Sequence, residues 1–346
     1  MKTPGPLVTA VVLNWNGQRI IERCLDSLLA QTHPSLEIIV VDNGSSDGSL
    51  ALIKDRYEGK VRIFENQSNL GFAGGCNVGI RAARGTYIAL LNSDAYAAPE
   101  WLEELLKVMA PDPRFGMGCG KTYFAHRDGI LENTGHVVFR DGLGRGRGRL
   151  ERDEGQYDQE TSSLCPMGCA ALYRKEMLEA AGLFDEKFFA YADDIDVGFR
   201  GRWLGYECVF VPGAHAWHEL SASFGMLSPL KAYLLERNRL WVIVKCFPKR
   251  YIAMAFFHTL MRYLYIVYGI VRRVGPVSKY VTKTSSLSLI LIFLKVYLST
   301  LWHLPYLLRE RRDLLRKRKA SVQDFEGWLN RYGISARDVA LNEVSY

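Results

Sequence analysis

Cysteine is scarce in this sequence, and its spacing matches neither a disulfide framework nor a zinc site. The seven cysteines are an odd number and are scattered through predicted helices and strands. Cys165 and Cys169 form the closest pair, but no His/Cys pair accompanies them at zinc spacing. We therefore expect no disulfide-stapled domain, and no metal role for this cysteine pair.

Two common enzyme signatures are also missing. The run Gly71-x-x-Gly74-Gly75 lacks the G-x-G-x-x-G spacing of dinucleotide-binding folds, which disfavours hydride chemistry. No Ser-His-Asp or Cys-His arrangement can be defended, so nothing indicates a nucleophilic residue. Residues 1–6 lack a basic, apolar signal sequence and a strand pattern follows at once, so we expect a cytosolic body.

Acidic residues are almost absent from one long region near the carboxyl end. Between Lys245 and Lys319 there are 16 Lys/Arg and 2 Asp/Glu, a net charge of +14, whereas the whole chain carries +7. A mildly acidic body therefore precedes a basic, apolar tail, which suggests an anionic partner, either a membrane surface or nucleic acid. At 346 residues and 48% apolar content, the chain can form one large or two ordinary domains with a sizeable core.

Short apolar strands alternate with helices through the first hundred residues. We expect strands at residues 7–13, 36–41, 61–64 and 86–91, with an amphipathic helix at residues 20–29. This alternation predicts a parallel sheet with right-handed crossovers. The polar and glycine-rich turns all follow strand carboxyl ends, so they should gather at the edge where open α/β sheets bind ligands.

The last of these strands ends in Leu90-Leu91-Asn92-Ser93-Asp94, which places a carboxylate at that edge. Aspartate is a hard oxygen ligand suited to Mg²⁺ or Mn²⁺, ions that usually carry a phosphate with them. Alternatively, Asp94 is a helix N-cap, because Pro99 and an amphipathic run follow it. The glycine run could let backbone approach a diphosphate, or it could be an ordinary loop before a helix.

Beyond Pro111 the pattern changes to short strands and loops with three polar clusters. Residues 142–149 alternate glycine with arginine and predict a flexible basic segment, either a mobile flap or a solvated loop. Residues 188–196 place Asp193, Asp194 and Asp196 behind three aromatic residues. A carboxylate in such surroundings tends towards the raised pKa of a general base, although acidic residues are also favoured in a helix's first turn.

Two further polar features remain open from the residues alone. His218 follows a predicted strand at residues 208–211, and a lone histidine is more often structural than a ligand. Glu236-Arg237-Asn238-Arg239 lies within a helix-like run at residues 229–246. This group could bind phosphate or merely cover a helix surface.

Six of these stretches, taken in order, resemble the family 2 glycosyltransferases, and among them the bacterial rhamnosyltransferase-like branch. The stretches are Val11-Val12-Leu13-Asn14-Trp15-Asn16-Gly17, Val40-Val41-Asp42-Asn43-Gly44-Ser45-Ser46-Asp47-Gly48-Ser49, Asn69-Leu70-Gly71-Phe72-Ala73-Gly74-Gly75-Cys76-Asn77, Leu91-Asn92-Ser93-Asp94-Ala95, Phe188-Phe189-Ala190-Tyr191-Ala192-Asp193-Asp194-Ile195-Asp196 and Arg237-Asn238. The resemblance covers roughly residues 7–245.

The resemblance implies a GT-A fold, an α/β architecture with a mainly parallel central sheet and flanking helices. A nucleotide half (about 1–110) and an acceptor half (about 111–245) would form the transferase domain. Membrane-associated helices (246–320) and a short tail (321–346) would follow.

The resemblance also implies roles for individual residues. Asp42 would contact the base, and the residues expected to line or shape the donor site are Asn14, Trp15, Asp42, Asn43, Asn69, Gly71, Asn77, Ser93 and Asp94. Asn92-Ser93-Asp94 stands where the family carries its D-x-D metal motif, so Asp94 is the dependable carboxylate ligand. His218 matches a histidine that completes metal coordination in some members. Asp194 falls at the catalytic base, with Asp193 beside it, and Arg237 is a candidate phosphate contact.

The implied reaction is inverting, Mg²⁺- or Mn²⁺-dependent sugar transfer, with L-rhamnose from dTDP-rhamnose as the best match. The acceptor would be a hydroxyl of a lipid-linked or cell-surface glycan. A UDP-sugar transferase (galactofuranose, glucose or N-acetylhexosamine) is the alternative within the family. A nucleotidyltransferase is a remote alternative, because neither a second metal carboxylate near Asp94 nor a glycine-arginine phosphate loop is evident. A non-enzymatic membrane- or nucleic-acid-binding protein is another remote alternative.

The tail contains two apolar stretches, residues 251–271 and 285–308, each long enough to span a bilayer. Arg262 and Lys295 lie near their middles, and a central charge costs ~2.5–3.5 kcal/mol on insertion. Basic residues also lie before, between and after the two stretches. If both stretches spanned the membrane, the basic segment between them would lie outside, against the positive-inside tendency. We therefore expect helices in or on the cytoplasmic leaflet, held by anionic lipid near a polyprenyl-linked acceptor, while a spanning hairpin stays open. Because the basic residues punctuate apolar runs, we expect no nucleic-acid partner.

Overall fold

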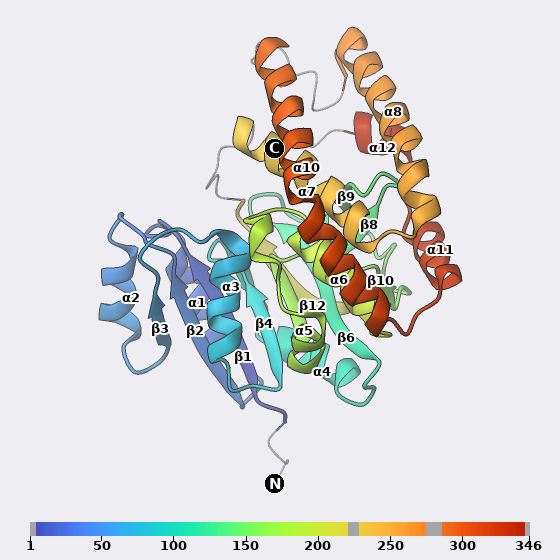
Figure 1. The fold of residues 1–346 in the computed structure, drawn as a ribbon. Coiled ribbons are helices and arrows are strands. Elements are labelled where there is room, and N and C mark those ends of the chain that lie inside the picture. Colours follow the sequence, from blue (N-terminus) through green and yellow to red (C-terminus); the bar gives the residue numbers. More distant parts are fainter. Residues whose placement is uncertain (1–4, 221–227, 275–285, 343–346) are drawn as a thin grey trace. The chain divides into compact units, whose positions relative to one another are not determined.

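The computed structural model describes residues 5–220, 228–274 and 286–342, which form two compact units. The first unit contains Met1–His136 and Gly146–Ser223, and the second contains Val137–Arg145 and Phe224–Tyr346. Figure 1 shows that helices flank a sheet in the first unit and that the second is mostly helical. This division differs from a boundary near residue 245, because the helix that ends there clusters with the later helices.

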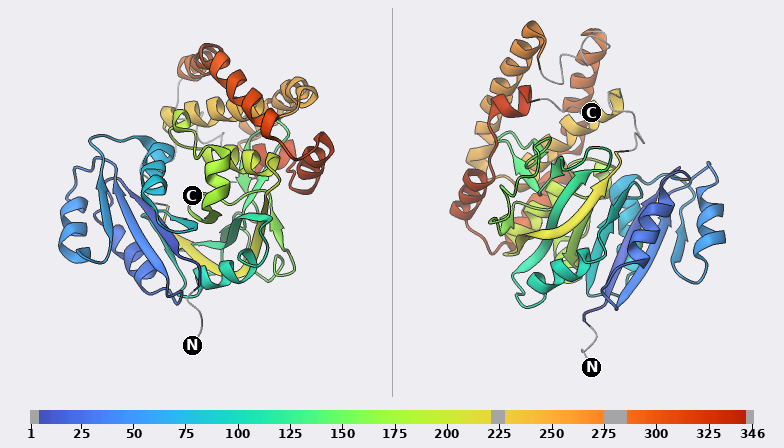
Figure 2. Two further views of the ribbon diagram at one scale, coloured as in Figure 1. Left: turned by 60° about the horizontal axis from the view of Figure 1, so that its bottom comes forward. Right: turned by 180° about the vertical axis from the view of Figure 1, so that it is seen from behind.

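The sheet of the first unit begins with four parallel strands. These are β1 (Val8–Asn14), β2 (Leu36–Asp42), β3 (Arg62–Glu65) and β4 (Tyr87–Leu91). Within the sheet they lie in the order β4-β1-β2-β3, which can be followed in Figure 1 and, from behind, in Figure 2. The predicted strands and their parallel pairing are confirmed. Because the strands are parallel, their carboxyl ends and the polar turns after them share one edge.

Three helices connect these strands: α1 (Ile21–Leu29), α2 (Ser49–Tyr57) and α3 (Gly71–Ala82). Much of the glycine run serves the packing of α3 on β1. A Cβ atom on Gly75 would overlap the Leu13 side chain, and one on Gly79 would overlap Val11. The missing side chains therefore let the helix approach the sheet closely.

The sheet continues with strands of mixed direction. β11 (Ala170–Arg174) runs antiparallel between β4 and β6 (Phe115–Phe124), and β12 (Glu207–His218) runs parallel to β6. The shorter elements of this half are β5 (Ala95–Ala97), β7 (Leu131–Asn133), β10 (Ser162–Ser163), α4 (Trp101–Met109), α5 (Lys175–Ala181), η1 (Glu186–Phe188) and α6 (Asp193–Trp203). Two further strands, β8 (His136–Val138) and β9 (Gly144–Gly146), pair separately.

The course of the chain after β4 removes one alternative for Asp94. The helix α4 has Glu100 at its N-cap position, and β5 intervenes between Asp94 and that helix. Asp94 therefore does not cap a helix. Its backbone oxygen instead accepts a hydrogen bond from Glu219 N (2.8 Å), which ties it to the end of β12.

The prediction of a flexible basic segment at residues 142–149 is wrong. The Arg147 guanidinium lies 5.0 Å over the Phe210 ring, and Arg149 is paired with the buried Glu132 (Nη1–Oε1, 3.2 Å). Aromatic and carboxylate partners from distant parts of the chain therefore order arginines that look solvated in sequence.

The second unit is built from helices that begin with α7 (Pro229–Cys246). The others are α8 (Lys249–Arg272), α10 (Ser286–Lys317), α11 (Val322–Arg331) and α12 (Ala336–Leu341). Ser228 caps α7 by accepting from Lys231 N, with Pro229 in the first turn. The two halves of α10, Ile290–Trp302 and Leu304–Lys317, meet at 58°, close to Pro305.

A buried ion-pair network joins α7 and α8 to the segment Val137–Arg145. Arg262 donates from Nε to Asp141 Oδ2 (2.6 Å) and from Nη2 to Glu236 Oε1 (2.9 Å). Arg239 pairs with the same two carboxylates, at 3.6 Å from Asp141 and 2.8 Å from Glu236. Arg239 is 1% exposed, so it does not merely cover a helix surface.

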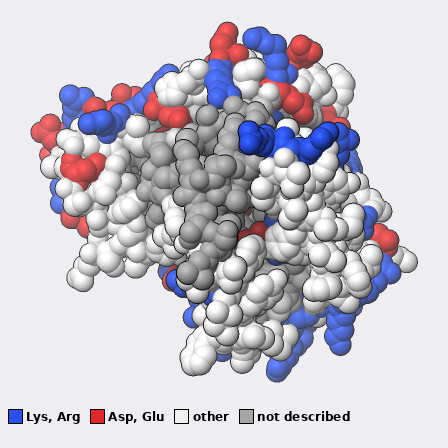
Figure 3. Space-filling view, turned by 90° about the horizontal axis from the view of Figure 1, so that it is seen from above, with Lys and Arg blue, Asp and Glu red and all other residues white. Residues whose placement is uncertain are grey.

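The two long helices of the second unit carry an apolar surface. Within the described parts of the chain, α8 is the single helix long and apolar enough to cross a membrane, and the two bent halves of α10 pass that test as a pair. The exposed apolar side chains on α8 and the first half of α10 include Phe256, Phe257, Leu264, Val267, Val271, Ile290, Leu294, Leu298, Leu301 and Trp302. Figure 3 shows a broad area without charged side chains, with Lys and Arg along parts of its border.

Candidate active site

The ends of β1 and β2 bring together two of the predicted donor residues. Their register pairs Asn14 with Asp42. Asn14 donates from Nδ2 to Asp42 Oδ1 (2.8 Å) and to Ser49 Oγ (2.9 Å), and Asp42 Oδ2 accepts from Ser45 N (3.0 Å). Both side chains are buried. The Asp42 carboxylate is therefore held in one orientation at the edge of the sheet, and Trp15, half-buried, follows directly on β1.

Asn43 joins the end of β2 to the start of α3. Its Oδ1 accepts from Asn66 Nδ2 (3.0 Å) and Leu70 N (3.1 Å), while its Nδ2 donates to Asn69 Oδ1 (2.9 Å) and Gly71 O (3.2 Å). The Asn43 amide is therefore saturated. Asn43, Asn69 and Gly71, predicted separately from sequence, form one connected turn.

The start of α3 is in turn fastened to the segment before α6. Gly71 has φ +75°, and a Cβ atom there would overlap Phe189 O, which accepts from Phe72 N (2.6 Å). Asn77 donates from Nδ2 to Phe184 O (2.8 Å) and accepts at Oδ1 from Phe184 N (3.1 Å). Gly71 and Asn77 therefore fix the position of α3 against the segment before α6, and the buried Asn77 amide is already hydrogen-bonded.

The chain enters α6 through a strained turn. Phe189, Tyr191 and Ala192 all have positive φ values, of 67°, 69° and 58°. Each costs free energy for a non-glycine residue, and such turns persist when the surrounding structure holds them. The turn delivers Asp193 and Asp194 to the amino end of α6, where the helix dipole favours negative charge.

Asp194 is a partly buried carboxylate with three hydrogen-bond donors around it. Its Oδ2 accepts from His136 Nε2 (2.9 Å) and Gly168 N (3.0 Å), and its Oδ1 accepts from Ile195 N (2.8 Å). Burial opposes the charge, but His136 and the two backbone N–H groups hold the pKa of Asp194 below its ordinary value. The expectation of a raised pKa is therefore wrong for Asp194.

The raised pKa belongs to Asp193 instead. This side chain is 4% exposed, and burial together with the neighbouring Asp194 charge raises the pKa of Asp193 well above its usual range. Asp196 is occupied by Arg200, which donates from Nε to its Oδ2 (2.8 Å). Of the three clustered carboxylates, Asp194 is thus the one that stays charged and unpaired with an arginine.

Asp94 and His218 meet at the carboxyl ends of β4 and β12. His218 Nε2 lies 3.1 Å from Asp94 Oδ1, and His218 Nδ1 lies 3.0 Å from Glu132 Oε2. Burial opposes protonation, but the two carboxylates raise the pKa of His218 to about 10. The sequence analysis missed Glu132, whose signal is a carboxylate inside the buried strand Leu131–Asn133.

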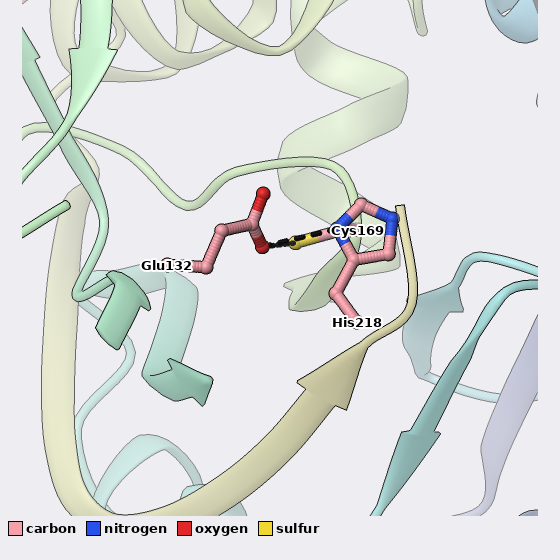
Figure 4. A group of neighbouring side chains, drawn as sticks. All are labelled: Glu132, Cys169 and His218. Atoms are coloured by element: carbon pink, nitrogen blue, oxygen red, sulfur yellow. Dashed lines mark hydrogen bonds and ion pairs between the residues drawn. The ribbon is translucent and has the colours of Figure 1, made fainter. Parts of the chain in front are cut away.

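Cys169 lies close to Glu132 and His218. Figure 4 shows Glu132 and His218 directed towards the Cys169 sulfur, and one ligand atom from each of the three lies within 4.8 Å of the others. The group could hold a metal, which the cysteine spacing did not predict. Burial and Glu132, however, raise the pKa of the Cys169 thiol well above its usual range, and Arg149 already neutralises Glu132.

The opposite face of His218 fits a divalent ion better. Asp94 Oδ1 and His218 Nε2, an oxygen and a nitrogen ligand atom, lie 3.1 Å apart, and both side chains retain some exposure. Mg²⁺ and Mn²⁺ accept such donors, whereas sulfur suits softer metals. Glu132 would then hold the other ring nitrogen, an arrangement common behind metal-bound histidines.

A family model described as Glycosyl transferase family 2 matches residues 9–182, half of the chain. The chain belongs to the family 2 glycosyltransferases. The predicted family is thereby confirmed, and with it the expectation of a glycosyltransferase enzyme.

Relatives of this transferase chain match only parts of it. An uncharacterized glycosyltransferase of a Nostoc species (alr2836) is 34% identical over 178 residues, 50% of this chain and 52% of its own length. The uncharacterized protein y4gI of Sinorhizobium fredii is 28% identical over 232 residues, 64% of this chain and 25% of its own length. The chondroitin synthase of Escherichia coli is 34% identical over 134 residues, 38% and 19% of the two chains. The chain spans between about a fifth and about half of the length of these relatives.

Solved structures confirm the predicted GT-A fold. GalNAc-T7, crystallised with UDP, GalNAc and Mn²⁺, has a TM-score of 0.58 at 16% identity, over 71% of this chain and 49% of that one. Mannosyltransferase PcManGT from Pyrobaculum calidifontis, in complex with GDP-Man and Mn²⁺, has a TM-score of 0.53 at 19% identity, over 90% and 86%. At these identities the likeness concerns the fold.

Arg237 is the one predicted site residue that lies in the second unit. Its Nε donates to Asn238 Oδ1 (2.8 Å), and its guanidinium lies 4.4 Å over the Trp241 ring. These buried contacts position Arg237 within α7, and we do not propose a phosphate contact for it. All other predicted residues belong to the first unit.

Proposed function

We propose that this protein catalyses inverting, divalent-metal-dependent transfer of a sugar from a nucleotide-diphosphate donor to a hydroxyl acceptor. The observation that carries the proposal is the Asp194 carboxylate, kept charged by three donors in a GT-A fold. The Asp94–His218 pair provides the second half of the site.

The donor nucleotide would lie along the carboxyl edge of β1, β2 and β4. Asp42, oriented by Asn14, is available to accept from a base N–H, with Trp15 beside it. Four further predicted residues would act indirectly on the donor, namely Asn43, Asn69, Gly71 and Asn77. Their contacts hold the turn between β2 and α3 and fix α3 to the segment before α6.

Asp94 and His218 would hold Mg²⁺ or Mn²⁺, with Ser93 next to the diphosphate. A bound divalent ion supplies Lewis-acid stabilisation of the negative charge that develops on the leaving diphosphate. Two neighbours of the same fold were crystallised with Mn²⁺, which supports a divalent ion here. Asn92 replaces the first carboxylate of the D-x-D pattern, so Asp94 is the principal carboxylate ligand.

The chemical step needs one base and no covalent intermediate. The acceptor oxygen bonds to the anomeric carbon as the bond from that carbon to the diphosphate oxygen breaks, and Asp194 takes the acceptor proton. Asp193 is less suited to this role, because it is 4% exposed and is buried beside the Asp194 charge. Attack from the face opposite the leaving group inverts the anomeric configuration.

For the sugar, L-rhamnose from dTDP-rhamnose is our first proposal, and it rests on the motif resemblance. A UDP-linked galactofuranose, glucose or N-acetylhexosamine is the second, supported by the neighbour GalNAc-T7, which was crystallised with UDP and GalNAc. Relatives that include polysaccharide synthases support a role in cell-surface glycan assembly.

The second unit would hold the enzyme at the cytoplasmic face of the membrane. Trp302 is 84% exposed and Phe256 is 70% exposed, and basic residues flank both helices, a combination suited to an anionic leaflet. Arg262, the charge that would hinder membrane insertion of α8, faces Asp141 and Glu236 inside the protein. This supports a peripheral attachment near a lipid-linked acceptor over a spanning hairpin.

A donor screen tests the proposed function. Detergent-purified protein would be assayed for release of nucleoside diphosphate from dTDP-rhamnose and several UDP-sugars, with Mg²⁺, Mn²⁺ or EDTA and a polyprenyl-glycan fraction. We expect turnover with one donor, lost in EDTA and in Asp194→Asn but retained in Asp128→Asn, an exposed aspartate. Equal activity of Asp194→Asn and the parent would overturn the assignment of the base. The absence of turnover and of calorimetric binding for every donor would overturn the function.

A further inference from the structure

His136 is the side chain that contacts the proposed base most closely, and no sequence motif points to it. It is 5% exposed at the start of β8, and its backbone N–H donates to Cys165 O (3.0 Å). Its Nε2 lies 2.9 Å from Asp194 Oδ2. The two residues are 58 positions apart in the chain.

The other ring nitrogen of His136 indicates where its ring N–H lies. His136 Nδ1 is buried and has no hydrogen-bond partner among the described residues. A proton on Nδ1 would be a buried donor without an acceptor, which costs more than a bare lone pair. The geometry therefore favours a proton on Nε2, where it is donated to the Asp194 carboxylate.

The two oxygens of Asp194 consequently differ. Oδ2 accepts from both His136 Nε2 and Gly168 N, whereas Oδ1 accepts from Ile195 N alone among the described residues. A carboxylate oxygen offers two lone pairs, so Oδ2 is saturated and Oδ1 retains one. The side chain is 13% exposed, so this lone pair remains within reach of a substrate.

Other titratable groups near Asp194 do not provide the same contact. They are Asp193 on α6, Cys165 and Cys169 before β11, and Tyr173 on β11. Burial raises the pKa of each of the four well above its usual range. His136 is therefore the only side chain among the described residues for which a direct hydrogen bond to the Asp194 carboxylate is found.

We propose that His136 is a positioning residue for Asp194: it occupies Oδ2 and leaves Oδ1 as the atom that receives the acceptor proton. The inference rests on the proposed function of Asp194 as the base. In the transfer step the acceptor O–H bond breaks, its oxygen bonds to the anomeric carbon, and the proton goes to Oδ1. His136 does not relay the proton onward, because its buried Nδ1 has no hydrogen-bond partner among the described residues.

Two substitutions separate positioning from mere packing. His136→Gln can keep an N–H donor near the place of Nε2, whereas His136→Met fills similar volume without a donor. We expect His136→Met to lower kcat about tenfold or more with little change in the donor KM. Its acidic limb in the pH profile of kcat/KM should move to higher pH by about one unit, because Asp194 loses a hydrogen bond to its charged form. The kcat of His136→Gln should stay within about threefold of the parent value, and its acidic limb should not move. His126→Met, at an exposed histidine, should behave as the parent.

A measurement without turnover keeps this proposal separate from the function. In protein labelled with ¹⁵N in its histidine rings, NMR should find a proton on His136 Nε2, and Asp194→Asn should shift the ring signals of His136. If no donor turns over but the Nε2 proton and the shift in Asp194→Asn are found, the proposed function fails and the positioning of Asp194 by His136 stands. An Nδ1–H tautomer, or equal losses of kcat in His136→Gln and His136→Met without a shifted acidic limb, would overturn the positioning role.

Discussion

At the scale of single residues, His218 has a proton that a metal ion would have to displace. It lies between the carboxylates of Asp94 and Glu132, which raise its pKa to about 10. A histidine must be neutral at the nitrogen that binds a metal, so binding at Nε2 releases a proton. The affinity for Mn²⁺ should therefore rise about tenfold per pH unit between pH 7 and 9, as measured by calorimetry.

Substitutions of Glu132 and Cys169, which surround His218, test that prediction further. Glu132→Gln should weaken Mn²⁺ binding by about 10- to 100-fold, because it removes the charge behind the ligand, and it should flatten the pH dependence. Cys169→Ala should leave affinity nearly unchanged if the ion lies on the Asp94 face. A larger loss for Cys169→Ala than for Asp94→Asn would move the metal to the group of Glu132, Cys169 and His218.

Residues whose partners are distant in the chain explain what sequence reasoning could not find. Asp94 follows the end of β4, and Asp194 lies in the first turn of α6. Both belong to recognisable motifs, so they could be predicted. Glu132 and His136 act on His218 and Asp194 across 86 and 58 positions, and nothing local marks that pairing. Residues 142–149 were misread for the same reason, since Phe210 and Glu132 supply their partners.

At the scale of elements, the strands of the nucleotide half were predictable because each is an apolar run that ends in a polar turn. The later strands were not. The predicted strand at residues 208–211 continues to His218, because β12 pairs with β6 near both of its ends, while its other edge pairs first with β10 and then with β5. Such pairing depends on strands far away in sequence.

The network between α7, α8 and Asp141 gives a prediction at this scale. Arg262→Met should lower the free energy of unfolding by about 3–5 kcal/mol, because it leaves a buried carboxylate with less compensation. Arg272→Met, at an exposed position on the same helix, should change it by less than about 0.5 kcal/mol. Denaturant titrations of the full chain compare the two, and equal effects would rule out a stabilising role for the network.

The same network predicts how acid affects the protein. Burial opposes ionisation, but Arg239 and Arg262 lower the pKa of Glu236 from 4.5 to about 2. A carboxyl with a depressed pKa contributes stability above its ordinary pKa and loses it as the pH falls towards the depressed value. The stability difference between the parent and Glu236→Gln should therefore shrink between about pH 4.5 and pH 2.

At the scale of the whole molecule, two compact units carry the proposed chemistry and the proposed attachment. The first unit contains the proposed base and the proposed metal ligands, and the second presents Trp302 and Phe256 from its long helices. We expect Phe256→Glu with Trp302→Glu to reduce binding to phosphatidylglycerol vesicles at least about tenfold, because both charges would enter an apolar phase. Val108→Glu, on an exposed part of α4, should leave vesicle binding unchanged.

Flotation of the full chain with vesicles provides the measurement. Binding should be stronger to anionic than to neutral vesicles and should weaken in high salt, because basic flanks contribute to it. Resistance to salt and to alkaline extraction would instead indicate a spanning hairpin. Unchanged binding of the double variant would show that another surface attaches the protein.

The anomeric configuration of the product tests the central claim most directly. With the donor from the screen that turns over, proton NMR of the first product formed would report the anomeric coupling and its configuration. Direct displacement with Asp194 as the base predicts inversion relative to the donor in every turnover. Retention of configuration would contradict the account, because it requires an intermediate or a mechanism that a single base at Asp194 does not provide.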